Sequence, residues 1–492
     1  MSDAKFKSLS TALLAMLVVT LAACGNEAAE KAATEQAAKV AAEAAAQQQA
    51  ADKARADEAA KIGVEAVAYG LPLMIAEFTR RISTNVAAPQ PDAHAPINQF
   101  GNMAKYPSAD NKDIVRMNVD TLYSFAFLDL AKEPQILSVP DTNGRYYLMP
   151  LIDAWTNIFA SPGKRTTGTK AANFVITGPL WSGALPAGMT EYKSPTNFVM
   201  IGGRTQANGP ADYPTVNSIQ ARYRLTPLSA WGKPYTPPPG TVDPSIDMSP
   251  PVEQVAKMSD TQYFQMLATL LRANPPPTAD APALAQLAKI GIVPGQDFNP
   301  ATLDPVVAKG LEGSVQRTLQ ELQTAGKTTG ERIDGWNSFP KNLANFGTDY
   351  GTRAVVALVG FGANIVEDAI YPTANVDGDG TQLNGANKYT LHFDKGQTPP
   401  ANAFWSLTMY NAQSFFVDNA INRYNIAAWM PLQYNKDGSL DIYIQRESPG
   451  KQQQANWLPA AEGEFSVTNR IYWPKPAALD GTWKASAITR VK

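Results

Sequence analysis

The chain has 492 residues, 44% of them hydrophobic and 17% charged, with a formal net charge of −2 at pH 7. This composition is typical of a folded protein long enough for two or three domains. It excludes a basic footprint for nucleic acid, which would need clustered Lys and Arg, and the single cysteine excludes a disulfide within the chain.

Residues 1–23 have the organisation of a secretory signal peptide. Lys5 and Lys7 precede the apolar stretch 9–20, and small residues lead to Cys24. The apolar stretch is shorter than the roughly 20 residues that a membrane-spanning helix needs. The sequence Leu-Ala-Ala-Cys that ends at Cys24 resembles the bacterial lipoprotein box, and this resemblance implies cleavage before Cys24 and lipid attachment to it. The alternative is an ordinary signal peptide with a coincidental cysteine.

The residues after Cys24 bear on where the protein resides. Gly25 and Asn26 follow it, without the aspartate that resembles an inner-membrane retention signal. We therefore expect a lipid anchor in the outer membrane, on its periplasmic or its surface face, since several acyl chains make such attachment stable. Residues 24–61 are rich in Ala, Glu, Gln and Lys. These strong helix formers predict a solvated helical tether, on the order of 50 Å long at 1.5 Å per residue.

Residues 62–233 predict a β-rich N-terminal domain. Its first residues continue the helix with an apolar face, and Gly70-Leu71-Pro72 should kink or end that helix. Beyond it, short apolar runs such as 146–149 and 174–176 alternate with turn signals.

The second half divides into three segments. Residues 234–251 are Pro-rich and predict a linker. Residues 252–372 are mainly helical by pattern, and their apolar stretch 353–370 predicts one buried helix. In residues 373–492, apolar and polar side chains alternate along short segments. These segments predict a jelly-roll-like antiparallel sheet. Taken together, the segments of the whole chain predict an α+β multi-domain protein.

Two long stretches resemble a pair of families. Residues 118–124 (Asn-Val-Asp-Thr-Leu-Tyr-Ser) and 201–205 (Ile-Gly-Gly-Arg-Thr) resemble domain-of-unknown-function family 1254. Residues 404–410 (Phe-Trp-Ser-Leu-Thr-Met-Tyr) and 470–474 (Arg-Ile-Tyr-Trp-Pro) resemble its usual partner, family 1214. The resemblance covers most of residues 63–491. It implies secreted or envelope proteins with β-rich, jelly-roll-like domains and a helical middle, and it transfers no activity or catalytic residues.

Familiar catalytic and cofactor motifs are absent from the sequence. The two histidines, His94 and His392, do not form a zinc protease motif, and there is no nucleophile elbow or dinucleotide fingerprint. Residues 377–380 (Asp-Gly-Asp-Gly) resemble part of a calcium loop, but the glutamate near its end is missing, which favours a tight turn. We expect no cofactor and no metal.

A polar set interleaved with aromatic residues is the candidate site. The candidate catalytic residues are Asp120, Asp153 and Tyr123. The candidate ligand-binding residues carry an amide, a guanidinium or an aromatic ring: Asn118, Trp155, Arg165, Arg204, Trp405, Tyr410 and Arg423. If they converge, they form a pocket for a sugar-like or carboxylated ligand, and Asp120 and Asp153 could act as acid and base as in glycoside cleavage. The alternative is structural, with buried Asp–Arg pairs and aromatic core residues.

These observations predict a bacterial cell-envelope lipoprotein that binds a small molecule or glycan. If the protein is an enzyme, we expect a hydrolase or a lyase. The alternative is a non-enzymatic structural or assembly protein of the envelope. The expected partners are the membrane, through the lipid, and a small ligand. Because jelly-roll domains commonly associate, a homo-oligomer is expected by fold analogy.

Overall fold

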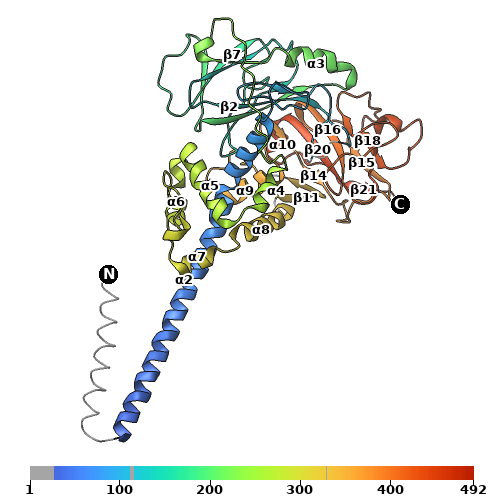
Figure 1. Cartoon of the computed structure of the whole chain (residues 1–492). Helices are drawn as coiled ribbons and strands as arrows, with labels where there is room; N and C mark the ends of the chain where they lie inside the picture. The colour runs from blue at the N-terminus through green and yellow to red at the C-terminus, as the bar shows by residue number, and fades with distance from the viewer. Residues whose placement is uncertain (1–26, 111–115, 329, 339, 492) are drawn as a thin grey trace.

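The computed structural model describes residues 27–110, 116–328, 330–338 and 340–491. The predicted signal peptide 1–23 and lipidation site Cys24 lie outside this part of the chain. Figure 1 shows two β-rich parts in contact, a group of helices below them, and one long helix that runs away from the body. Helices and antiparallel sheets together confirm the predicted α+β class.

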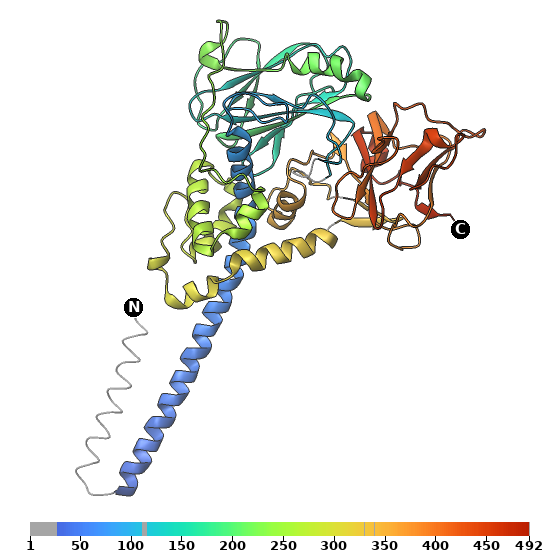
Figure 2. The same cartoon turned by 45° about the vertical axis from the view of Figure 1, so that its right-hand side comes forward.

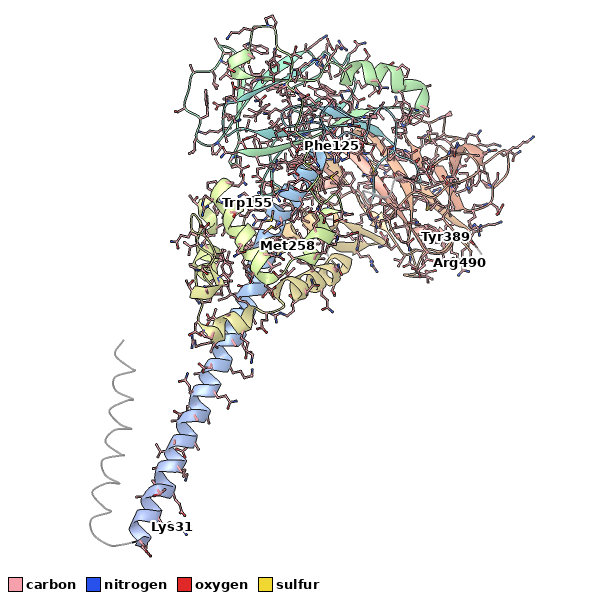
Figure 3. The ribbon with its side chains drawn as sticks, viewed as in Figure 1. Lys31, Phe125, Trp155, Met258, Tyr389 and Arg490 are labelled. Carbon is pink, nitrogen blue, oxygen red and sulfur yellow. The ribbon has the colours of Figure 1, made fainter. Side chains whose placement is uncertain are left out.

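Helix α2 (Glu27–Thr84) is a single helix of 58 residues. Its first buried residue is Ala59, and the part before it is almost entirely exposed. At 1.5 Å per residue that exposed part extends roughly 50 Å. Figure 3 labels Lys31 near its free end, far from the β-rich parts. Among the described helices, α2 alone is long and apolar enough to cross a membrane, but 72% of its most apolar stretch is buried within the protein itself.

The predicted break at Gly70–Pro72 is wrong, because α2 continues through Pro72 to Thr84. Tertiary packing explains the difference. Leu71 and Met74 are fully buried in the helical core, and this burial offsets the backbone hydrogen bond that proline removes. Gly70 has a separate role, since a Cβ atom there would lie 2.7 Å from the side chain of Leu267. Glycine thus permits the close approach of a second helix.

Short helices surround the buried half of α2 (Figure 2). They are α4 (Pro251–Lys257), α5 (Asp260–Ala273), α6 (Ala281–Ala288), α7 (Pro305–Leu311), α8 (Ser314–Thr328) and α9 (Tyr350–Val359). The helix predicted over 353–370 is shorter than expected, because α9 stops at Gly360 and a turn with Gly362 at φ +78° follows. Glycine at positive φ favours chain reversal over continued helix.

The N-terminal β-rich part consists of two sheets around one apolar core. The first sheet contains β1 (Gly101–Asn102), β2 (Thr121–Asp129), β4 (Tyr147–Leu148), β5 (Leu151–Asp153), β6 (Ile158–Ala160) and β9 (Phe198–Gln206). The second contains β3 (Gln135–Val139), β7 (Ala172–Thr177), β8 (Thr190–Lys193) and β10 (Arg224–Pro227). Helix α3 (Tyr213–Gln220) packs beside them, and β7 and β8 are parallel.

The C-terminal β-rich part is also a two-sheet sandwich. Its larger sheet contains β11 (Glu331–Ile333), β12 (Trp336–Ser338), β13 (Ala369–Ile370), β14 (Thr373–Ala374), β16 (Ala401–Asn411), β17 (Asn425–Ala427) and β20 (Phe465–Pro474). Its smaller sheet contains β15 (Tyr389–Phe393), β18 (Leu440–Gln445), β19 (Trp457–Pro459) and β21 (Ile488–Arg490). Strands β18 and β19 are parallel, and a short helix α10 (Pro476–Leu479) follows β20.

The hairpin β11–β12 corrects one detail of the sequence analysis. It lies within the segment 252–372 that was predicted to be mainly helical, yet it forms the edge of the C-terminal sheet. Trp336 explains the pairing, since it is buried in the sandwich core and its indole N–H donates to the carbonyl of Ser486.

Candidate functional site

One face of the larger C-terminal sheet is polar and nevertheless buried. In the paired strands β16 and β20, alternate residues such as Leu407 and Val467 fill the sandwich core. The remaining residues point to the opposite face, which is polar except for Phe404: Ser406, Thr408, Tyr410, Ser466, Thr468, Arg470 and Tyr472. The polar face of an antiparallel sheet is normally solvated, but every one of these side chains is buried. The N-terminal part covers them.

The segment from Arg116 to Asp120 makes the contact between the two β-rich parts. The Tyr410 hydroxyl donates to the carbonyl of Met117 at 2.6 Å, and Arg470 donates to the carbonyls of Arg116 and Met117. Arg116 donates in turn to the Thr468 hydroxyl at 3.3 Å. The segment therefore lies across the polar face.

Asp120 is fully buried at this contact. Its carboxylate accepts hydrogen bonds from Ser406 at 2.6 Å and from Asn425 at 2.7 Å, both in the C-terminal sheet. Asn118 holds the preceding turn, because its side-chain oxygen accepts the backbone N–H groups of Asp120 and Thr121. Burial raises the pKa of Asp120, and the two hydrogen bonds partly offset this effect.

Tyrosines and arginines surround this contact and form what we call the interdomain cluster. Its members are Arg116, Asp120, Tyr123, Arg204, Tyr371, Tyr410, Arg470 and Tyr472. Each guanidinium lies over one ring. The distances to the ring centroids are 5.7 Å from Arg116 to Tyr410, 5.5 Å from Arg204 to Tyr123 and 5.2 Å from Arg470 to Tyr371. Arg470 is buried, whereas Arg116 and Arg204 are partly exposed.

Several buried polar atoms of this face have no hydrogen-bond partner within the described residues. They are the hydroxyls of Thr408, Ser466 and Tyr472 and the Nε of Arg470. A buried polar group without a partner costs roughly 1–3 kcal/mol, and such groups are rare in folded proteins. Such atoms also occur elsewhere in the described residues, for example at Arg353, but on this face four of them lie together on two neighbouring strands. Their grouping makes this face a candidate place for polar contacts that the protein itself does not make.

The tyrosine hydroxyls of this cluster are neutral hydrogen-bond donors. Burial raises the pKa values of Tyr371, Tyr410 and Tyr472 above their ordinary value near 10. These phenols are therefore neutral at pH 7. The oxygens of Tyr123 and Tyr371 already accept from Asn118 and Asn364, both at 2.5 Å, which leaves their protons to be donated elsewhere.

Two hollows lie near this region. A narrow depression of about 170 Å³ is lined by Arg116, Tyr410 and Phe416, among others, and is too tight for a water-sized sphere. A wider polar groove of about 500 Å³ lies on the N-terminal part beside Arg145. Two arginines line this groove: Arg145 is bound to Asp212 through two hydrogen bonds of 2.6 and 2.8 Å, and Arg222 donates to the carbonyl of Ser218 at 3.2 Å. The groove contains none of the predicted site residues. The smaller depression, at the edge of the interdomain cluster, is therefore the more relevant one.

Asp153 and Trp155 lie in a different place, which separates the predicted acid–base pair. They join what we call the Arg353 cluster: Tyr69, Asp153, Trp155, Asp280, Tyr350 and Arg353. Trp155 lies beside the buried part of α2 (Figure 3). Asp120 contacts the C-terminal sheet, whereas Asp153 accepts from its own turn at Asn157. The two carboxyl groups therefore have different neighbours and do not form one acid–base site.

Arg353 is fully buried at the centre of its cluster. Its guanidinium carbon lies 4.9–5.3 Å from the ring centroids of Tyr69, Trp155 and Tyr350. The hydroxyls of Tyr69 and Tyr350 both donate to Asp280, at 2.9 and 2.8 Å. Burial raises the pKa of Asp153 to about 6. Asp153 and Asp280 lie near enough to offset the charge of this guanidinium, although its three nitrogens have no hydrogen-bond partner and no salt bridge among the described residues.

The remaining predicted residues have structural contacts. Trp405 belongs to the sandwich core and packs on Phe393. Arg423 donates to three main-chain carbonyls, those of Gln454, Ala455 and Trp457. Arg165 pairs with Asp368 at 2.7 Å at the margin of the interdomain cluster.

Arg116, Tyr371, Arg470 and Tyr472 are not among the site residues predicted from the sequence. Arg470 and Tyr472 belong to the stretch 470–474 that resembles family 1214, but the polar face of a strand is normally solvated and so gives no sign of a site. The signal that could have found them is the row Ser466, Thr468, Arg470 and Tyr472, in which an arginine and a tyrosine share a face with two hydroxyls.

The comparisons with known proteins agree with the tandem arrangement. Residues 97–227 match a family model described as a protein of unknown function, DUF1254, and residues 368–476 match a second one, DUF1214. The predicted pair of families and its order along the chain are thereby confirmed, whereas the matches cover two separate segments and not the whole of residues 63–491. Together the two matched segments contain every residue of the interdomain cluster.

One similar solved structure shows the same fold. The VPA0106 protein from Vibrio parahaemolyticus is 23% identical, covers 88% of this chain and 100% of its own length, and superposes with a TM-score of 0.66. An uncharacterized protein from Burkholderia cenocepacia is 11% identical, with 91% and 97% coverage and a TM-score of 0.43. No curated protein matches the chain.

Proposed function

We propose that this protein binds a small molecule between its two β-rich parts, at the interdomain cluster. The observation that supports this function best is the set of unpartnered polar atoms on the buried face of β16 and β20, at Thr408, Ser466, Arg470 and Tyr472. A purely structural interface would pair such groups or replace them with apolar ones.

We also propose that the protein is lipid-anchored at the bacterial cell envelope, in the outer membrane. The support is the sequence around Cys24 and the exposed half of α2, which would hold the body roughly 50 Å from the anchor. Labelled fatty acid should be incorporated into the wild type and not into Cys24→Ser. Equal labelling of both proteins would contradict the anchor.

A thermal-shift screen of the purified protein against sugars, peptidoglycan fragments, organic acids and divalent metals tests the binding function. A ligand that binds the native state raises the melting temperature in a concentration-dependent way. The rise should be smaller in Ser466→Ala, which removes one unpartnered hydroxyl, and unchanged in Ser194→Ala, whose hydroxyl is bonded to the carbonyl of Thr196.

The structural alternative makes the opposite prediction. If no compound shifts the melting temperature, or if Ser466→Ala responds to the ligand as the wild type does, the interdomain cluster is an interface and not a ligand site. The search would then turn to protein partners of the envelope.

A further inference from the structure

The interdomain cluster has a surplus of positive charge. It contains three guanidiniums, those of Arg116, Arg204 and Arg470, and one carboxyl group, that of Asp120. None of these arginines forms a salt bridge with a carboxylate in the part of the chain that the structure describes. Arginine cannot lose its proton at physiological pH, so the charges stay, and burying them without a counter-charge is costly.

The hydrogen bonds of the cluster do not remove this surplus. Arg204 donates to the carbonyls of Gly202 and Gly362 and to the side-chain oxygen of Asn364. Arg470 donates to Tyr410 and to the carbonyls of the segment that crosses it. These partners satisfy N–H groups, but they carry no net charge.

The groups that still lack partners can all donate a hydrogen bond, and the three hydroxyls among them can also accept one. The Arg470 Nε carries only a proton to donate, and the Tyr472 hydroxyl has no partner at all. The protons of Tyr123 and Tyr371 have no acceptor among the described residues, since the hydrogen bonds of both oxygens are accepted ones. A ligand that accepts hydrogen bonds and carries negative charge would complement both these donors and the surplus of positive charge.

We infer that the ligand of this site is an oxyanion, a small molecule with a carboxylate or phosphate group. It enters by widening the narrow depression beside Arg116 and Tyr410, which is too tight for a water-sized sphere in this structure, and binds between Arg470, Tyr472 and the facing tyrosines. This inference rests on the proposed function and names its ligand class. Guanidinium and phenol donors match carboxylate and phosphate oxygens in geometry and charge. Arg116 and Arg204 are partly exposed, so part of the positive charge of the cluster reaches the surface.

The test compares each oxyanion with a neutral molecule of the same shape. Melting temperatures of the purified protein are measured at constant ionic strength with acetate and acetamide, with succinate and succinamide, and with phosphate. The carboxylates or phosphate should raise the melting temperature, and the amides should not. Phosphate acting alone would assign a phosphate ester, and carboxylates acting alone an organic acid; either result supports the inference.

Two tyrosine variants locate the effect. Tyr472→Phe removes only the unpartnered hydroxyl, and it should weaken the apparent affinity for the active oxyanion roughly ten-fold or more, because hydrogen bonds to charged groups are strong. Tyr223→Phe is the matched control, since its buried hydroxyl is bonded to Thr205 at 2.7 Å outside the cluster. Tyr371→Phe is an independent second variant if Tyr472→Phe does not fold.

The outcomes separate this inference from the proposed function. If an amide stabilises the protein as well as its acid does, the charge inference is overturned while small-molecule binding stands. If no probe, charged or neutral, shifts the melting temperature, both are overturned. If the oxyanion effect survives unchanged in Tyr472→Phe and Tyr371→Phe, the anion binds elsewhere and the inference is wrong.

Discussion

Two clusters in this protein bury arginine among aromatic rings, and they differ in their balance of charge. In the Arg353 cluster one guanidinium faces three rings and lies near two carboxyl groups, Asp153 and Asp280. In the interdomain cluster three guanidiniums share one carboxyl group. We call the Arg353 cluster the balanced cluster and the interdomain cluster the unbalanced one. The balanced cluster joins α2 to the turn after β5 and to α9, which is a structural role. The unbalanced cluster has the electrostatics of a site for a charged partner.

The largest expected effect is the loss of the central charge in the balanced cluster. Arg353→Met leaves Asp280 and Asp153 buried without their cation, and removal of one partner from a buried ionic group typically costs about 3–5 kcal/mol. Chemical denaturation should therefore show a large fall in the free energy of unfolding.

Arg470→Met is the matched substitution in the unbalanced cluster. It removes hydrogen bonds and the positive charge that lowers the pKa of Asp120, but it also relieves the repulsion from Arg116 and Arg204. We therefore expect a cost of about 2 kcal/mol or less, smaller than that of Arg353→Met. If Arg470→Met destabilises the protein as much as Arg353→Met does, the distinction between the two clusters fails.

The next effect is a pH dependence of the balanced cluster. Burial raises the pKa of Asp153 to about 6, above the value near 4 in an unfolded chain. The folded state thus holds this proton more tightly. The contribution of this protonated carboxyl group to the free energy of unfolding is fully present below about pH 4 and is lost as the pH rises through about 6. The free energy of unfolding changes by roughly 3 kcal/mol between these limits.

Asp153→Asn tests this dependence, because asparagine can still accept the backbone N–H of Asn157. Relative to the wild type, the variant should gain stability as the pH is raised from 4 to 7. The free energies of unfolding at the two pH values measure this gain. A constant difference between the two proteins across that range would show that Asp153 does not titrate there.

The smallest effect compares a paired and an unpaired hydroxyl. Thr408 in the interdomain cluster has no partner for its hydroxyl, whereas the Thr205 hydroxyl is bonded to Tyr223. Thr408→Val should raise the free energy of unfolding of the ligand-free protein by about 1 kcal/mol, and Thr205→Val should lower it by a similar amount. Destabilisation by both substitutions would indicate that Thr408 has a partner after all.

Local patterns predicted most strands but not how the parts meet. The alternation of Tyr389, Leu391 and Phe393 identified β15 correctly, since these residues fill the core. The helix end predicted at Pro72 is wrong, because the free-energy cost of proline inside a helix is outweighed by tertiary packing, which the local sequence does not show. Likewise, the polar face of β20 has the same pattern whether it meets water or another domain.

The candidate site was predicted in part for the same reason. Asn118, Asp120 and Tyr123 are close in sequence, and the structure keeps them together at the contact. Asp153 was grouped with them by residue type, but its neighbours are set by α2 and α9. The neighbours of a side chain at a contact between domains are set by tertiary packing, so the local sequence does not predict them.

A crystal structure of the protein soaked with 3-bromobenzoate, whose aryl bromine is not displaced by protein nucleophiles, would test the central claim most directly. The carboxylate should bind beside the Arg470 Nε and the Tyr472 hydroxyl, with an anomalous bromine peak between β20 and the N-terminal part. Bromine peaks only at the outer surface, together with Thr408, Ser466 and Tyr472 hydrogen-bonded to protein groups, would contradict it.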